Sequence, residues 1–224
     1  MVRRILRRAQ REARALVARL DALAARIERR EAVRAIARAT PRRVNLCCGT
    51  QRVPGWLGID AAGDADLILD LSRADLPFPD ASLEAVVCMS AINYFTRARA
   101  AELAREIFRV LRPGGVCRIG VQDMKGLAER YVRGDVAFFF QKLPDGRDRY
   151  EGPTIGDKFA AWFYGYSAGA YRCEYFYDFD SLAHLFKEAG FPTIERRAFR
   201  DSRLPDVERV DNRPEQMFFL EAVK

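Results

Sequence analysis

Short apolar runs recur along the chain from residue 43 onward, separated by the glycine, proline and acidic residues that are typical of turns. They predict about seven strands. One of these ends at Asp60, and the other six span Val44–Leu46, Leu67–Leu71, Leu83–Cys88, Val116–Val121, Thr193–Phe199 and Met217–Val223. Apolar residues spaced three and four apart predict helices at Arg97–Leu111 and Asp180–Ala189. Strands that alternate with helices predict an α/β fold with a Rossmann-like, doubly wound sheet.

The first 40 residues differ from the rest in pattern and in charge. Residues 2–38 contain neither glycine nor proline and are rich in strong helix formers. A narrow apolar seam follows helical spacing at Leu6, Ala9, Ala13, Leu16, Leu20, Leu23 and Ile27. Twelve arginines and four acidic residues give residues 1–40 a charge of +8, against +7 for the whole chain. The pattern predicts a long basic amphipathic helix at 1–40, followed by a nearly neutral domain at 41–224.

Three roles are open for this helix. It can pack on the domain or pair with a second copy of itself, leaving its arginines solvated. It can attach to an anionic membrane surface, a task that suits a basic amphipathic helix. Nucleic-acid binding is less favoured, because arginines without interleaved aromatic residues give attraction but no base readout.

Composition indicates a soluble globular protein, with 49% hydrophobic and 31% charged residues. No apolar run approaches the roughly 18 residues of a membrane span, and the arginine-rich start lacks a secretory apolar segment. We therefore expect a cytoplasmic protein, with peripheral attachment to a membrane surface as a variant. The five cysteines show no Cys-x-x-Cys spacing, which favours reduced, buried thiols over disulfides or zinc. No structural metal is predicted.

A strand, a turn of small residues and a second strand with a terminal acid stand together near the start of the domain. They read Arg43-Val-Asn-Leu-Cys-Cys-Gly-Thr50 and Gly55-Trp-Leu-Gly-Ile-Asp60. Small residues let a backbone approach a ligand closely, and a carboxylate at the next strand end can accept hydrogen bonds from a ribose. Ten residues between Gly49 and Asp60 are too few for the helix of a dinucleotide fingerprint. The pattern predicts a nucleoside-cofactor site other than an NAD site.

These residues resemble motif I and the second-strand acid of class I S-adenosylmethionine (SAM)-dependent methyltransferases. They are similar to a small subgroup with the pattern Leu-Asn-Leu-Gly-Cys-Gly…Pro-Gly-Trp…Val-Asp, whose members often methylate surface glycans or small molecules. The resemblance continues through Asp70, Pro77-Phe-Pro-Asp80, Arg109-Val-Leu-Arg-Pro-Gly-Gly115 and Tyr177-Asp-Phe-Asp-Ser-Leu182. It implies SAM as cofactor and a sheet with one antiparallel strand, formed where the last two strands pair as a hairpin at the edge.

The resemblance also implies roles for the cofactor-binding residues. Asp60 would hold the ribose, Asp70 and Leu71 the adenine, and residues 45–49 the methionine part. The predicted cofactor set is Asn45, Cys47, Gly49, Asp60, Ala61, Asp70, Leu71 and Ser90. Cys47 departs from the family, which has glycine there, and a side chain at that position can either crowd or line the methionine part of the cofactor. Asp70 has an alternative role as the cap of a turn.

The acceptor side is less constrained. Many subgroup members carry His-x-x-Glu-His after the fourth strand, where this chain has Ser90, Asn93 and Tyr94, so no acid–base role is carried over and the catalytic residues stay unknown. Residues 124–176 form an irregular, aromatic-rich insertion expected to lie over the sulfonium, or to form a small satellite core. The predicted substrate-binding residues are Asn93, Tyr94, Asp123 and Tyr166. For Asp123, a loop-capping role is equally open.

Methyl transfer from SAM to an oxygen or nitrogen of a small-molecule or glycan acceptor is the function that these features favour. The alternative is a catalytically degenerate methyltransferase-like protein that serves as a binding or scaffold module and is attached through its basic helix. The retained Asp60 and Asp70 favour cofactor binding, whereas the lost glycine and histidines favour the alternative.

Overall fold

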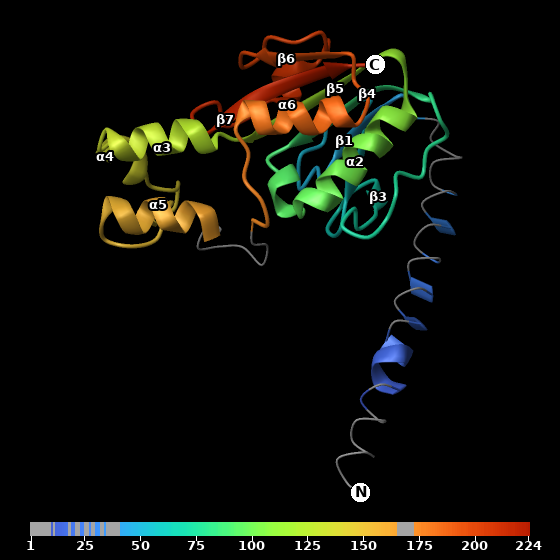
Figure 1. Ribbon diagram of the computed structural model, residues 1–224, viewed down its shortest axis with the longest axis horizontal. Helices are drawn as coiled ribbons and strands as arrows, with labels where there is room; N and C mark the ends of the chain where they lie inside the picture. The colour runs from blue at the N-terminus through green and yellow to red at the C-terminus, as the bar shows by residue number, and fades with distance from the viewer. Residues whose placement is uncertain are drawn as a thin grey trace, which may run out of the picture.

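A computed structural model describes residues 41–164 and 173–224 without interruption (Figure 1). Of the first 40 residues it describes 10, 12–17, 19–20, 23–24, 27, 30–31 and 34, all of them helical. The apolar seam residues among them, Leu16, Leu20, Leu23 and Ile27, are 49–57% exposed and belong to none of the buried apolar clusters. No helix within the described residues has the length and apolarity to cross a membrane.

Seven strands form one sheet in the order β3-β2-β1-β4-β5-β7-β6. Their bounds are β1 Arg43–Leu46, β2 Leu57–Asp60, β3 Leu67–Ile68, β4 Leu83–Met89, β5 Leu111–Gln122, β6 Thr193–Arg197 and β7 Met217–Val223. β1 pairs in parallel with both β2 and β4, whereas β7 runs antiparallel to β5 and β6. The predicted seven-stranded α/β sheet with one antiparallel strand is confirmed.

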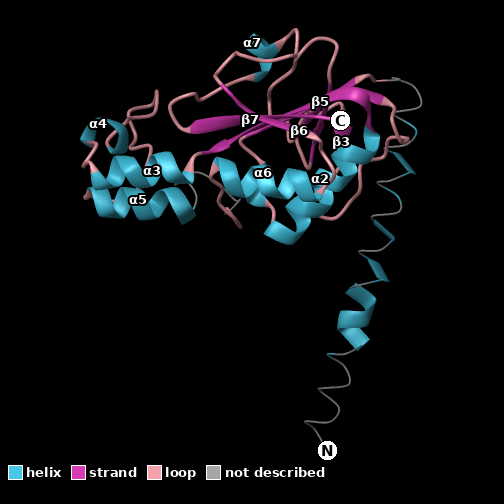
Figure 2. Cartoon of the chain, turned by 45° about the horizontal axis from the view of Figure 1, so that its top comes forward, coloured by secondary structure: helices cyan, strands magenta, loops and turns pink. Residues whose placement is uncertain are grey.

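The two faces of the sheet are covered differently (Figure 2). Helices α2 (Arg97–Val110) and α6 (Phe179–Glu188) pack beside one another on the face that carries the largest apolar cluster. Loops and the short α7 (Val207–Val210) cover the opposite face, where Val53 and Trp56 join a second cluster. Residues 47–56, between β1 and β2, contain no helix, which agrees with the short spacing in the sequence.

A charged cluster is buried between β5, β7 and the α7 region. The fully buried Arg118 guanidinium donates to Asp211 Oδ1 at 2.7 Å and Asp211 Oδ2 at 2.6 Å, and to Glu221 Oε2 at 3.2 Å. It also donates to the backbone carbonyls of Ala198 and Asp201, both at 2.9 Å. These five bonds hold the segment that precedes β7 against the centre of the sheet.

The insertion after β5 is more regular than its sequence suggests. It contains α3 (Met124–Val132), α4 (Val136–Phe139) and α5 (Ile155–Tyr164), beginning where Asp123 and Asp135 cap α3 and α4. Its rings pack on one another in a separate apolar cluster of Leu127, Phe138, Phe139, Tyr150 and Trp162, with Phe159, Phe163 and Phe176 against it. We call residues 124–164 the aromatic lobe, and it lies to one side of the sheet (Figure 1). Within residues 124–164 the chain is more helical than expected, and the satellite core, one of the two expected arrangements, forms there.

Most of the remaining element bounds agree with the pattern-based expectations, but β5 begins at Leu111, five residues before the expected Val116. A 3-10 turn, Ile92–Tyr94, follows β4, and α2 begins after Thr96, whose side chain accepts a hydrogen bond from Arg99 N. α6 begins with a capping box between Asp178 and Ser181 and is followed by Gly190 at a φ of 107°. β3 is shorter than expected, since the chain turns at Asp70.

Candidate active site

A cavity of about 620 Å³ opens where the carboxyl ends of β1, β2 and β4 meet. Seven residues that the sequence assigned to the site line it: Cys47, Asp60, Ala61, Asp70, Leu71, Ser90 and Tyr94. The rest of the lining is Leu69, Ser72, Ala91, Phe95 and Glu174. We call it the acidic cavity, because its ionised side chains are the carboxylates of Asp60, Asp70 and Glu174. Its volume is in the range of sites for small organic ligands.

Asp60 joins the end of β2 to the turn after β1. Its Oδ2 accepts a hydrogen bond from Gly49 N at 2.8 Å, and its backbone carbonyl accepts one from Leu69 N at 2.8 Å. Among the described residues, no group donates to Oδ1, so this oxygen is available to a hydroxyl in the cavity. The carboxylate therefore shapes the turn and can bind a diol at the same time.

Asp70 combines the two roles that the sequence left open. Its Oδ1 accepts from Ser72 N at 2.9 Å, and its backbone carbonyl accepts from Arg73 N and Ala74 N. The Arg73 guanidinium lies 3.6 Å from Oδ2. Asp70 thus caps the turn after β3 while its side chain, 38% exposed, lines the acidic cavity.

Cys47 occupies a backbone position that favours glycine. Its φ is 52° and that of Gly49 is 54°, so both ends of the Cys47–Gly49 turn lie in the left-handed region. For a residue with a Cβ this conformation costs roughly 1–2 kcal/mol. The thiol is packed against the main apolar cluster, which offsets part of that cost. The side chain therefore lines the cavity wall at a backbone position that favours glycine.

The Cys47 thiol stays protonated at neutral pH. Its hydrogen bond with Cys88 raises its pKa well above the usual value, and burial and the negative charges of Asp60 and Asp70 raise the pKa further. A thiolate here would face two carboxylates without a cation beside it. Cys47 is thus a neutral wall residue and an unfavourable nucleophile.

We expect Cys47 to react with iodoacetamide at a rate that still rises between pH 9 and pH 10. An ordinary thiol, with a pKa of about 8.5, is already mostly thiolate at pH 9, so its rate gains little by pH 10. A thiol with a strongly raised pKa gains several-fold over the same interval, because its thiolate fraction is still low at pH 9. Peptide-resolved mass spectrometry of the folded protein measures the rate, with Cys47→Ser identifying the labelled peptide. A plateau already reached at pH 8.5 would contradict the raised pKa.

Ser90 and Tyr94 form the wall at the end of β4. Ser90 has a φ of 58°, and its Oγ accepts from Gln122 Nε2 at 2.9 Å and from Arg213 Nη1 at 3.1 Å. Burial raises the pKa of Tyr94, and Cys173 raises it further, while Arg213 lowers it. Tyr94 is therefore a protonated phenol at neutral pH.

A second cavity, of about 340 Å³, shares this wall. Cys47, Ser90 and Tyr94 line both cavities, so the two meet along these three side chains. The second cavity is further lined by Asn45, Cys48, Gly49, Thr50, Gln51, Met89, Asn212 and Arg213. We call it the Arg213 cavity. It contains Asn45 and Gly49, the two remaining cofactor residues that the sequence predicted.

The residues predicted to bind the acceptor do not lie together in the structure. Asn93 is fully buried, donates to Cys173 Sγ at 2.9 Å and lines neither of the two cavities. Asp123 caps α3 through Gly126 N and pairs with Arg196 at 3.1 Å, beside a separate small cavity under the aromatic lobe. Tyr166 lies outside the described residues. Of the three predicted residues that the structure describes, Asn93, Tyr94 and Asp123, only Tyr94 lines either of the two adjoining cavities.

Sequence reasoning missed Arg213 and Glu174. Arg213 precedes β7, and because β7 is antiparallel its first residue lies beside the last residue of β5, at the ligand edge of the sheet. The prediction of an antiparallel last strand thus contained the signal for Arg213. Glu174 is placed by its backbone bond to the Asn93 carbonyl at 2.8 Å, a contact for which no local pattern exists.

Residues 59–119 match the sequence profile of a family described as a methyltransferase domain. The match spans β2 to β5 and so includes Asp60, Asp70, Ser90 and Tyr94. It supports a SAM-dependent methyltransferase in general, and S-adenosylmethionine is the cofactor that it indicates. No curated protein matches the chain.

Solved structures of SAM-dependent methyltransferases resemble the chain weakly. One from Mesorhizobium loti is 16% identical over 82% of this chain and 90% of its own, with a TM-score of 0.44. One from Archaeoglobus fulgidus is 13% identical over 88% of this chain and 94% of its own, with a TM-score of 0.48. One from Methanosarcina mazei is 15% identical over 81% of this chain and 91% of its own, with a TM-score of 0.46. The fold assignment therefore rests on the strand order itself.

Proposed function

We propose that the protein transfers the methyl group of SAM to an oxygen or nitrogen of a small-molecule or glycan acceptor. The observation that carries the proposal is the acidic cavity, which ends at the wall of Cys47, Ser90 and Tyr94 with the Arg213 cavity beside it. Two adjoining cavities at the carboxyl edge of a parallel sheet suit two ligands that react with each other.

The residues of the acidic cavity fit the cofactor. The uncommitted oxygen of Asp60 would accept from the ribose hydroxyls, while Asp70 and Leu71 would face the adenine. Three carboxylates suit a ligand with a net positive charge. When bound, SAM supplies an electrophilic methyl group on a sulfonium.

The shared wall of Cys47, Ser90 and Tyr94 would align the reactants and exclude water rather than transfer a proton. Cys47 and Tyr94 are protonated at neutral pH, and Ser90 is held by Gln122 and Arg213, so this wall offers no strong base. Alignment of reactants and exclusion of water can supply much of the rate of a displacement. An amine in its neutral form needs no base, which makes a nitrogen acceptor the simplest match.

Calorimetric titration with SAM and with S-adenosylhomocysteine tests the cofactor part of the proposal. We expect dissociation constants on the order of micromolar for both, equivalent to about −8 kcal/mol, and no heat from NAD, which serves as the control nucleotide. Labelled SAM incubated with pools of amines, phenols and sugars then tests transfer. A folded protein that binds neither cofactor form would contradict the proposal and favour the scaffold alternative.

A further inference from the structure

The Arg213 cavity differs from the acidic cavity in charge. Arg213 is the only side chain of its lining that is ionised at neutral pH, since the pKa values of Cys47, Cys48 and Tyr94 are all raised. Three carboxylates line the neighbouring acidic cavity. A ligand that reaches from one cavity to the other, or two ligands that meet at the wall, would encounter opposite charges on the two sides.

Two asparagine side chains in the lining carry buried amide atoms that have no hydrogen-bond partner within the described residues. Asn45 is only 2% exposed, and neither its Oδ1 nor its Nδ2 makes a hydrogen bond within the described residues. The same holds for Asn212 Oδ1. Buried polar groups are normally paired, so an unpaired amide in a cavity wall points to a polar group of a ligand. Asn45 and Asn212 come from different parts of the chain, the first from β1 and the second from the loop before β7.

Arg213 is held in place by its backbone and by its neighbours. It has a φ of 49°, and its carbonyl accepts from Gln216 N at 3.1 Å. Asp211, two residues earlier in the chain, accepts two hydrogen bonds from the buried Arg118 guanidinium. Ser90 Oγ takes one of the five N–H donors of the guanidinium, and no other acceptor is present among the described residues. The remaining donors suit a planar carboxylate or a phosphate.

We propose that the Arg213 cavity is the acceptor subsite and that it selects an acceptor with a carboxylate or phosphate group. The Arg213 guanidinium binds that anion, and the Asn45 and Asn212 amides bind neighbouring hydroxyl or amino groups. The methyl-accepting atom then lies toward the wall of Cys47, Ser90 and Tyr94. This inference rests on the proposed methyltransferase function.

The test uses full-length protein saturated with S-adenosylhomocysteine and titrated with inorganic phosphate, with glucuronate, and with glucose as the uncharged control for glucuronate. We expect at least one anion to bind and glucose not to bind. Arg213→Met should raise the dissociation constant of the anion at least tenfold, and Arg213→Lys should restore part of the affinity. Comparison of phosphate with glucuronate decides between the two anionic groups.

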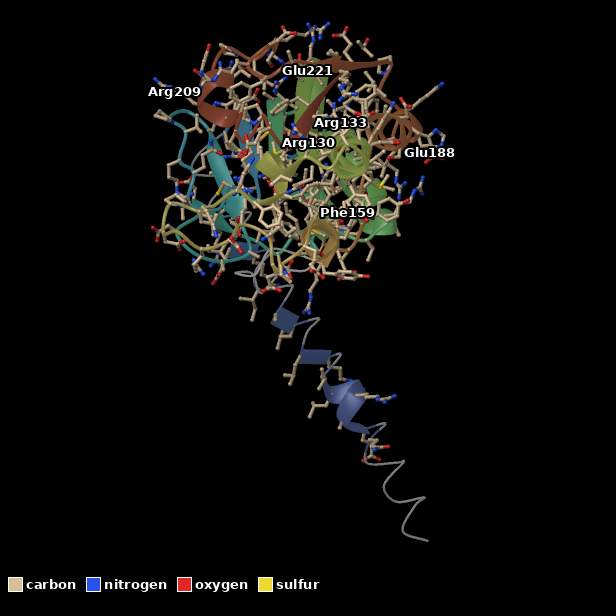
Figure 3. The ribbon with its side chains drawn as sticks, turned by 90° about the vertical axis from the view of Figure 1, so that its left-hand side faces the viewer. Arg130, Arg133, Phe159, Glu188, Arg209 and Glu221 are labelled. Atoms are coloured by element: carbon tan, nitrogen blue, oxygen red, sulfur yellow. The ribbon has the colours of Figure 1, made fainter. Side chains whose placement is uncertain are left out.

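Arg209→Met is the matched control. Arg209 is exposed on α7, at the rim of the molecule in Figure 3, and its side chain has no partner within the described residues. Its loss changes the net charge by the same amount as Arg213→Met without touching the cavity, so anion affinity should stay within about twofold. Equal losses in both variants would reduce the effect to general surface charge and overturn the proposal.

A second pair of ligands separates acceptor binding from cofactor binding. Methylthioadenosine lacks the carboxylate of S-adenosylhomocysteine. If Arg213→Met weakens S-adenosylhomocysteine tenfold and leaves methylthioadenosine unchanged, then Arg213 binds the cofactor's carboxylate and the proposal is wrong. It is also wrong if the wild-type complex binds neither anion. Failure of the wild type to bind S-adenosylhomocysteine at all would instead be a failure of the proposed function.

Discussion

Asp60→Asn is expected to weaken the binding of S-adenosylhomocysteine about 100-fold. The asparagine oxygen can still accept from Gly49 N, so the turn between β1 and β2 keeps its hydrogen bond. The second carboxylate oxygen becomes an NH₂ group, which cannot accept from ribose hydroxyls. Hydrogen bonds to a charged group contribute about 1.5–3 kcal/mol each, so the loss amounts to about 3 kcal/mol. Calorimetric titration of both proteins measures the ratio.

Asp64→Ala provides the comparison for this experiment. Asp64 is an exposed carboxylate close to Asp60 in sequence, outside the lining of the acidic cavity. Its removal alters the net charge by the same amount and should leave cofactor affinity within about twofold. An Asp60→Asn protein that binds as tightly as wild type would show that the carboxylate serves the turn alone.

Arg118→Met is expected to lower the free energy of unfolding by about 3–5 kcal/mol. The substitution leaves Asp211 and Glu221 buried with their charges uncompensated by the guanidinium. Asp211 keeps only a neutral backbone donor, Arg200 N, among the contacts of the described residues. Glu221 keeps Ser202 Oγ and the Arg203 guanidinium, which lies 3.4 Å from Oε1. Denaturant unfolding followed by circular dichroism measures the change.

Arg112→Met is the matched substitution on the same strand. Arg112 lies in β5 and pairs with Glu84 at 3.2 Å, with the arginine side chain 53% exposed. Exposed pairs of this kind contribute about 0–1 kcal/mol. Equal free energies of unfolding for Arg118→Met and Arg112→Met would show that the buried Arg118 cluster contributes no more to stability than an exposed ion pair.

The strands of the sheet could be predicted because each is a short apolar run bounded by turn residues. The run at Met217–Val223 coincides with β7, and the largest differences are at β3, which ends three residues earlier than predicted, and at β5, which begins five residues earlier. The position of Asp60 could be predicted for the same reason, since the last residue of a parallel strand lies at the ligand edge. Local pattern and sheet geometry are sufficient for this part of the site.

The aromatic lobe could not be predicted by the same reasoning. Glycines at 126, 134, 146, 152 and 156 hide the helical periodicity, and clustered rings suggest a ligand surface as readily as a core. Packing among Phe138, Phe139 and Trp162 decides the outcome, and it depends on helices distant in sequence. For Arg213, the antiparallel last strand predicts that the chain before β7 reaches the ligand edge, while contacts of the buried Arg118 with Asp211 fix the loop in which Arg213 lies.

Asp123 and Tyr177, which flank the segment that contains the aromatic lobe, lie side by side. Asp123 and Tyr177 form a parallel bridge, and Met124 N donates to the Tyr177 carbonyl at 3.0 Å. A segment whose two ends are already hydrogen-bonded can change in length and content without disturbing the strands that flank it. Such a segment can be replaced as a unit during evolution. In protein engineering, the Asp123–Tyr177 bridge is therefore a suitable junction for exchanging one lobe for another on an unchanged sheet.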